Sequence, residues 1–113
     1  MIYQKDQLSS QEIVPGYKAR VVHTDRMTIV FWDIDSGAEL PEHSHEHEQV
    51  VQVMQGTFEL VINGQVQDLH PGDVVVIPGN VPHSGKALTA CVLQDTFAPV
   101  REDFTPSEIL QML

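Results

Sequence analysis

Short apolar runs alternate with turn residues at intervals of about ten positions, a rhythm typical of an all-β barrel or sandwich. The segments expected to form strands are 19–23, 27–34, 50–54, 57–62, 65–69, 74–77, 81–83 and 90–97. Asn63 and Gly64 predict a two-residue hairpin, because both residue types tolerate the positive φ of a type I′ turn. The run 74–77 is continuously apolar, which predicts a strand buried on both faces.

The end of the chain changes character. The segment Thr105–Glu108 has the form of a helix capping box with proline at the first helical position. We therefore expect a short C-terminal helix whose apolar residues, within 109–113, dock on the barrel. No repeat, linker or low-complexity segment divides the sequence, so residues 1–113 are expected to form one domain.

Charge and composition narrow the classes of partner. The 113 residues include 16 acidic and 6 basic side chains, a formal net charge of −10. This balance argues against nucleic acid and against anionic membrane surfaces as partners. No apolar run is long enough to span a membrane, and the polar N-terminus does not resemble a signal peptide. The single cysteine, Cys91, fits a cytoplasmic protein, and its place in an expected strand favours a buried structural thiol.

Histidines gather in the segment 42–49. His43, His45, His47 and Gln49 occupy every second position. In an extended strand these side chains would share one face, where two imidazoles can converge on one ion and Gln49 can add an oxygen. A hydrophilic loop with solvated histidines is the alternative. His47 shares this face and could itself be a metal ligand. A position next to the ligands without binding the metal, or a position in solvent, is favoured.

A further histidine, His83, follows an expected strand and a proline turn. The spacing of these residues resembles the two motifs of the cupin family, in the form Gly37-x5-His43-x-His45-x3-Gln49-x6-Gly56 and Gly72-x5-Pro78-x4-His83. This resemblance implies a double-stranded β-helix, or jelly-roll barrel, of the all-β class. It also implies one divalent transition metal held by His43, His45, Gln49 and His83.

The sequence departs from the usual cupin pattern at two positions. Asn80 replaces a usual glycine, a change that the left-handed conformation tolerates. Gln49 replaces a usual glutamate, so the four ligands leave the charge of the ion uncompensated. We therefore expect a strong Lewis acid and an anion-binding site, with less support for oxygen activation. Alternatively, Gln49 only hydrogen-bonds the barrel wall.

The segment 91–104 carries a second group of candidate residues. Alternation places Asp95 and Phe97 on the same face as Cys91 and Leu93. A carboxylate on an inward face is costly unless it is paired or lies near a cation. From the pattern alone, an outward and solvated Asp95 remains an equal alternative.

A more specific resemblance covers this segment. Together with the histidine cluster, the pattern Asp95-x-Phe97-x-Pro99-x-Arg101-Glu102-Asp103-Phe104 is similar to the pectin-degradation cupins of the KdgF type. That resemblance implies a ligand set of three histidines and a glutamine. It implies an isomerase-like enzyme that opens 4,5-unsaturated monouronates from pectin or alginate to their linear keto form. Asp95, Phe97 and Arg101 would belong to its active site.

The chemistry of these side chains suits such a substrate. Arg101 can grip a carboxylate through two hydrogen bonds. Asp95 can move a proton to carbon 4, and Phe97 can pack against the sugar ring. The resemblance favours nickel, with zinc, iron or manganese as alternatives. A metal-dependent dioxygenase and a non-catalytic sugar-acid binding protein are the competing functions. We also expect a homodimer, because pairing covers an edge strand of a small barrel.

Overall fold

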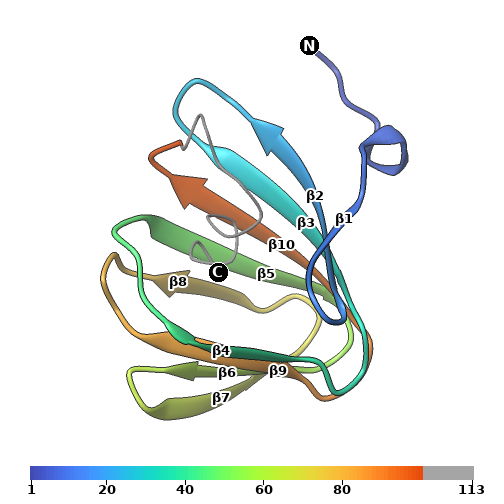
Figure 1. Ribbon diagram of the computed structural model, residues 1–113. Helices are drawn as coiled ribbons and strands as arrows, with labels where there is room; N and C mark the ends of the chain where they lie inside the picture. Colours follow the sequence, from blue (N-terminus) through green and yellow to red (C-terminus); the bar gives the residue numbers. More distant parts are fainter. Residues whose placement is uncertain (101–113) are drawn as a thin grey trace.

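The computed structural model describes residues 1–100, which form a barrel of two antiparallel sheets that face each other (Figure 1). A short 3-10 turn, η1 (Lys5–Gln7), precedes the strands. The strands are β1 (Gln11–Val14), β2 (Tyr17–His23), β3 (Thr28–Ile34), β4 (Glu39–His43), β5 (Glu48–Gln55), β6 (Phe58–Ile62), β7 (Gln65–Leu69), β8 (Val74–Ile77), β9 (His83–Ala87) and β10 (Cys91–Ala98). The all-β expectation is confirmed.

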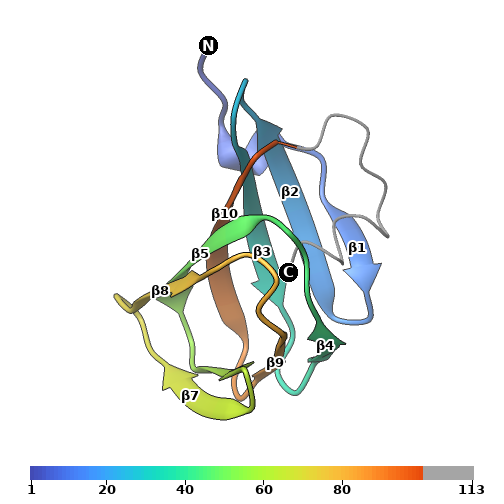
Figure 2. The ribbon, with the colours of Figure 1, turned by 90° about the vertical axis from the view of Figure 1, so that its left-hand side faces the viewer.

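Strand order divides the barrel into two layers. The larger sheet has the order β1-β2-β3-β10-β5-β8, and the smaller has the order β4-β9-β6-β7. In Figure 1, β4, β6, β7 and β9 lie below the strands of the larger sheet, and Figure 2 shows β7 at the lower end of the molecule. The sheets come together at one end of the molecule and spread apart at the other, as Figure 1 shows. The connection between β4 and β5 lies at the spread end and crosses from one sheet to the other.

The core follows the period-2 alternation of the strands. In β10, Cys91, Leu93, Asp95 and Phe97 are all buried, while the residues between them are half-buried. The largest buried side chain is Trp32 on β3, whose ring meets that of Tyr17 edge to face at 6.0 Å between centroids. Aromatic pairs of this geometry add to the stabilisation that burial provides. The burial of Asp95 confirms the inward position, one of the two alternatives that the sequence left open for this residue.

Most expected strands are present with small shifts at their ends. The turn at Asn63 and Gly64 is confirmed, with φ values of 49° and 80° between the paired residues Ile62 and Gln65. The sequence pattern identified neither β1 nor β4, and β9 shares only His83 with the segment expected at 81–83. No described helix is long and apolar enough to cross a membrane. The expected C-terminal helix lies outside the described residues.

The expectation for the apolar run 74–77 is wrong in one respect. Strand β8 lies at the edge of the larger sheet, and Val74 and Val76 are 58% and 59% exposed. Only its other face is covered, where Ile77 is fully buried. Continuous apolar sequence predicted burial on both faces, whereas the fold leaves one face of this strand open.

Candidate metal centre

Three histidines from separate elements meet at the spread end of the barrel. His43 ends β4, His45 lies in the connection to β5, and His83 begins β9. His43 and His83 are direct register partners across the β4–β9 pair. One ring nitrogen of each histidine lies within 4.8 Å of the others. The three imidazoles can therefore hold one ion.

The local backbone differs from the expected continuous strand over residues 43–49. Residues 44–47 are not in a strand, because the chain crosses there from the smaller sheet to the larger one. His45 consequently reaches the cluster from a loop and not by strand alternation. His47 is fully buried, and its carbonyl oxygen lies 3.0 Å from His45 Nδ1. His47 does not belong to the cluster of His43, His45 and His83, and its burial excludes the solvated position that the sequence left open for it.

Backbone carbonyl groups orient all three rings. The Nδ1 atoms of His43, His45 and His83 lie 2.8, 3.0 and 2.9 Å from the carbonyl oxygens of Pro41, His47 and Val81. Since a carbonyl oxygen can only accept, these contacts favour a proton on Nδ1 and leave a lone pair on Nε2. Hydrogen bonds of this kind set the tautomer and the ring direction of metal-binding histidines.

Gln49 stands beside the cluster with its amide in a defined direction. Its Oε1 atom lies 3.2 Å from His45 Nε2, and its Nε2 atom donates to Asp95 Oδ2 at 3.3 Å. Burial, with neighbouring His83 and His43 as further causes, lowers the pKa of His45 to about 4. A neutral imidazole carries one N–H proton, but each ring nitrogen of His45 faces an acceptor oxygen. Nδ1 faces the carbonyl oxygen of His47, and Nε2 faces Gln49 Oε1. A cation between His45 Nε2 and Gln49 Oε1 would satisfy both atoms, so these residues fit a metal ion.

Asp95 lies on β10, two residues before Phe97, which is the register partner of Gln49. It is 2% exposed, and Trp32 Nε1 donates to its Oδ2 atom at 3.1 Å. Among the described residues, the second oxygen, Oδ1, is buried without a hydrogen-bond partner. Burial raises the pKa of Asp95 to about 7, although the hydrogen bonds from Trp32 and Gln49 oppose this shift. Trp32 is not among the site residues that the sequence predicts, although alternation along β3 places it on the inward face.

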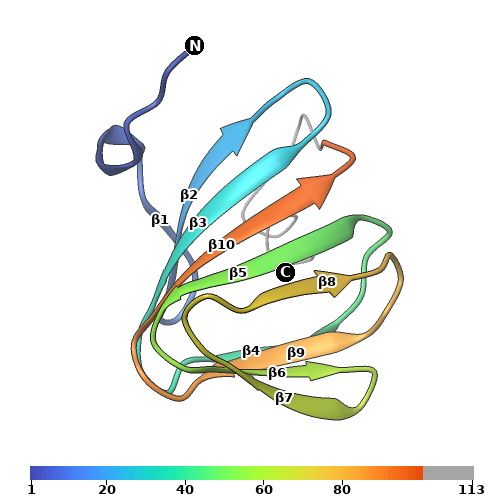
Figure 3. The same ribbon diagram turned by 180° about the vertical axis from the view of Figure 1, so that it is seen from behind.

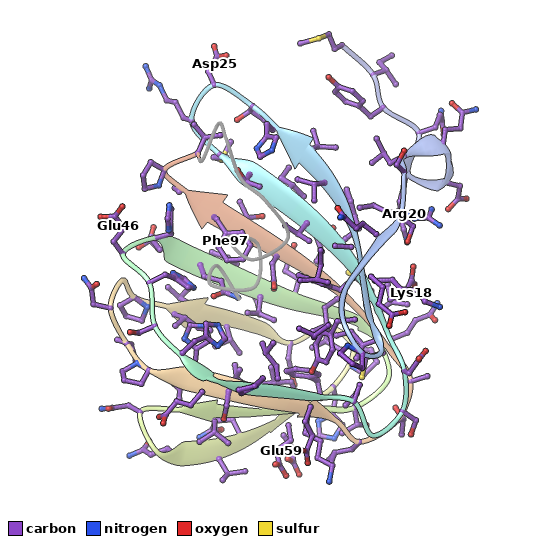
Figure 4. All side chains as sticks on the ribbon, viewed as in Figure 1. Lys18, Arg20, Asp25, Glu46, Glu59 and Phe97 are labelled. Atoms are coloured by element: carbon purple, nitrogen blue, oxygen red, sulfur yellow. The ribbon has the colours of Figure 1, made fainter. Side chains whose placement is uncertain are left out.

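Phe97 completes the described part of the site. Its ring is fully buried and meets the ring of His45 edge to face, with 5.8 Å between centroids. In Figure 4, Phe97 lies beside the ribbons of β10 and β5, while Glu46 points outward from the β4–β5 connection. Phe97 and Gln49 are register partners, so the ring stands directly beside the amide. Arg101 lies outside the described residues.

The turn after β8 supports the loop that carries His45. The backbone N–H of Asn80 donates to the carbonyl oxygen of His45 at 2.6 Å. Asn80 has φ 65°, the left-handed conformation that the sequence analysis expected it to tolerate. At Gly79, a Cβ atom would collide with the carbonyl oxygen of Glu46. The two halves of the site thus contact each other through backbone as well as through the imidazole rings.

A small cavity lies deeper in the barrel. Its walls include Trp32, Gln49, Leu93, His83 and Asp95, and its volume is about 20 Å³. A cavity of this size holds about one water molecule and is too small for a sugar.

Comparison with known proteins agrees with this architecture. A family model described as the cupin domain matches residues 30–95. The pectin degradation protein KdgF of Dickeya dadantii (strain 3937) is 33% identical over 102 residues, which cover 88% of this chain and 93% of that relative.

Two solved structures are similar over most of the chain. An RmlC-like cupin from Shewanella frigidimarina NCIMB 400 has a TM-score of 0.85 and 33% identity, covering 91% of this chain and 94% of that one. KdgF from Halomonas sp. has a TM-score of 0.85 and 32% identity, covering 91% of this chain and 96% of that one. The extent of these matches, together with the barrel and its three clustered histidines, shows that this chain belongs to the cupin family.

Proposed function

We propose that this protein is a metal-dependent enzyme of pectin or alginate breakdown that opens 4,5-unsaturated monouronates to their linear keto form. The observation that carries the proposal is the contact chain from the imidazoles through Gln49 to Asp95. It sets an uncharged group of metal ligands beside one carboxyl group inside a largely apolar barrel. The similarity to two proteins named KdgF, one described as a pectin degradation protein, supports the substrate class.

The ligands of the proposed metal are His43, His45, Gln49 and His83. When bound, a divalent ion would supply Lewis-acid stabilisation of negative charge on substrate oxygens. Imidazole and amide donors do not cancel the charge of the ion, which favours an anionic sugar acid at the site. Nickel is the favoured metal, and zinc, iron and manganese also suit such donors.

The reaction is an isomerisation, so it needs no oxidant and releases nothing. The hydroxyl group on carbon 1 loses its proton, the bond between carbon 1 and the ring oxygen breaks, and carbon 1 becomes an aldehyde. The ring oxygen becomes an enol oxygen on carbon 5. A proton then moves to carbon 4, and carbon 5 becomes a ketone.

This chain's residues have separate parts in that sequence. Asp95 would move the proton, because its Oδ1 atom has no hydrogen-bond partner among the described residues. Phe97 would limit water access and pack against the sugar, since its ring already lies against His45. Arg101 is proposed to bind the substrate carboxylate through paired hydrogen bonds.

A direct test follows the ultraviolet absorbance of the conjugated double bond in the unsaturated monouronate. We expect the absorbance to fall faster with the protein than without it, and chelator treatment to return the rate to the spontaneous value. A rate equal to the spontaneous one would overturn the proposal. The assay is repeated without oxygen, because dependence on oxygen would indicate a dioxygenase. Saturable sugar-acid binding with no acceleration would indicate a binding protein.

A further inference from the structure

The one tryptophan of the sequence, Trp32, is buried beside the candidate metal centre. The strands that carry Trp32, Asp95 and Gln49 are neighbours in the larger sheet, in the order β3-β10-β5 (Figure 3). Asp95 is the register partner of Val30, so Trp32 is its diagonal neighbour, two positions further along β3. An aromatic side chain on the same face can reach such a diagonal neighbour. Trp32 and Gln49 thus approach Asp95 from the two strands that flank β10.

The buried N–H group of Trp32 depends on Asp95. Its Nε1 atom donates to Oδ2 of Asp95 at 3.1 Å. The register partners of Trp32 are Ala19 on β2 and Leu93 on β10, whose side chains are apolar. An indole nitrogen can only donate, and a buried N–H without an acceptor carries the full cost of its removal from water. The carboxyl group of Asp95 is therefore the acceptor that makes the burial of this N–H favourable.

The indole ring is itself held in place from its other side. The ring of Tyr17 meets it edge to face, and the Tyr17 hydroxyl group donates to the carbonyl oxygen of Ala38 at 3.2 Å. Trp32 and Tyr17 are each 1% exposed. Large side chains packed in this way have little freedom to turn. The N–H of Trp32 therefore has a fixed direction. The Gln49 amide, which ends in both a donor and an acceptor, could present either end to Asp95.

Two donors at one carboxyl oxygen restrict where a proton of Asp95 can lie. Oδ2 accepts from Trp32 and from Gln49. A proton on Oδ2 would require the Gln49 amide to turn its oxygen toward Asp95. The amide nitrogen, which has no lone pair for a metal ion, would then face His45. Trp32 disfavours this turned arrangement, because a protonated Oδ2 is a weaker acceptor for its N–H.

We propose that Trp32 is a positioning residue that acts through Asp95 on both parts of the site. Its N–H holds Oδ2 as an acceptor, so the proton that Asp95 transfers is carried on Oδ1. The same contact keeps the amide oxygen of Gln49 directed toward the imidazoles. The role of Oδ1 rests on the proposed function, whereas the effect on Gln49 concerns metal affinity alone.

The first test measures the affinity of the metal-free protein for zinc by isothermal titration. Trp32→Phe removes the N–H but keeps an aromatic ring, and it should weaken zinc binding about tenfold. Tyr17→Phe is the matched control, because it removes a hydrogen bond from the same ring pair that is not directed at Asp95. It should change the affinity less than about twofold. In a Gln49→Ala background, Trp32→Phe should have no further effect, since the amide through which it acts is absent.

The indole signal of the parent protein gives a second measurement, which needs no Trp32 variant. Because the sequence has one tryptophan, the nuclear magnetic resonance spectrum of nitrogen-labelled protein holds one indole N–H signal. Asp95→Leu removes the acceptor and should move this signal upfield. Asp95→Asn keeps an oxygen acceptor and should leave the signal near its parent position. Circular dichroism checks the folding of each variant.

Turnover of the unsaturated monouronate tests the part that concerns the proton. With saturating metal, Trp32→Phe should lower kcat about 10- to 100-fold. KM should change less than about twofold, because a misplaced proton affects the chemical step and not substrate binding. A higher KM at unchanged kcat would contradict the placement of the proton on Oδ1.

Other outcomes would overturn the remaining parts. Unchanged zinc affinity in Trp32→Phe, or equal weakening in Tyr17→Phe, would limit Trp32 to core packing. The same loss of affinity with and without Gln49 would show that Trp32 acts by another route. An indole signal that Asp95→Leu leaves in place would exclude the hydrogen bond. A parent protein that does not accelerate the reaction would overturn the proposed function and the role of Oδ1, while the zinc affinities decide the effect on Gln49 separately.

Discussion

The side-chain amide of Gln49 donates from Nε2 to Oδ2 of Asp95 at 3.3 Å, and this bond determines which end of the amide faces the imidazoles. Trp32 donates to the same oxygen, so Oδ2 acts as an acceptor for both groups. The amide oxygen is therefore directed toward His45. A glutamate at position 49 would set two carboxyl groups against each other. Asp95 thus provides a physical reason for glutamine where many cupins have glutamate.

We predict that Gln49→Glu destabilises the metal-free protein by about 1–3 kcal/mol at pH 8, because a buried acceptor then faces another acceptor. Thermal unfolding after chelator treatment measures the effect. Gln52→Glu makes the same change on the outer face of the same strand, and its expected effect is within about 0.5 kcal/mol. Adding Asp95→Asn to Gln49→Glu should restore more than half of the lost stability. The interpretation fails if Gln52→Glu is equally destabilising.

We predict that Asp95→Asn lowers turnover of the unsaturated monouronate by about 100- to 10,000-fold but leaves metal content unchanged. An asparagine oxygen can still accept from Trp32 and Gln49, whereas the side chain can no longer carry a proton. Asp95→Leu removes the acceptor as well, so metal affinity should also fall. Metal analysis and steady-state kinetics separate the two effects. Unchanged turnover in Asp95→Asn would limit Asp95 to positioning Gln49.

We predict that Gly79→Ala weakens metal binding about tenfold, an effect typical of changes just behind metal ligands. The new methyl group would displace the carbonyl oxygen of Glu46 and, with it, the loop that carries His45. Isothermal titration of the metal-free protein measures the affinity. The control is Gly56→Ala. A Cβ atom at Gly56 would collide with the carbonyl oxygen of Ala90 and strain a residue with φ 83°. Gly56 follows the end of β5 that lies away from the imidazoles. Gly56→Ala should lower thermal stability and leave affinity unchanged; the opposite pattern would contradict the prediction.

We predict that Cys91 reacts slowly with a disulfide reagent at pH 8. Burial raises the pKa of its thiol, although hydrogen bonds with Thr89 oppose the shift, and only the thiolate is reactive. The side chain is 3% exposed, and its Sγ atom lies 3.2 Å from the carbonyl oxygens of Thr57 and Thr89. Unfolding in guanidinium should accelerate the reaction at least about 100-fold. Equal rates in the folded and unfolded protein would show that the thiol is accessible.

The local sequence pattern predicted the features that depend only on neighbouring positions in the chain, such as the face on which a side chain lies and the type of a turn. Alternation placed Asp95 and Phe97 on one face of β10, and the structure buries both. The Asn63 and Gly64 turn followed from the backbone conformations that these residue types allow. Motif spacing identified the cupin fold and the three histidines that the structure brings together.

Features that depend on the relation between the two sheets were not predictable in this way. The expected strand over 43–49 fails because the chain changes sheets at residues 44–47. The exposure of Val76 depends on the edge position of β8, which strand order decides and local sequence does not. Trp32 was missed as the partner of Asp95 because β3 and β10 are adjacent only in the folded barrel.

The pairing of His43 with His83 has a consequence for the kinetics of folding. The two residues are separated along the chain by β5, β6, β7 and β8, so β4 and β9 must pair before both imidazoles can meet. Such distant contacts carry a large loop-closure cost and form late during folding. An ion that binds only the completed site would slow unfolding while leaving the folding rate unchanged. The metal would therefore lengthen the lifetime of the native barrel without directing its formation.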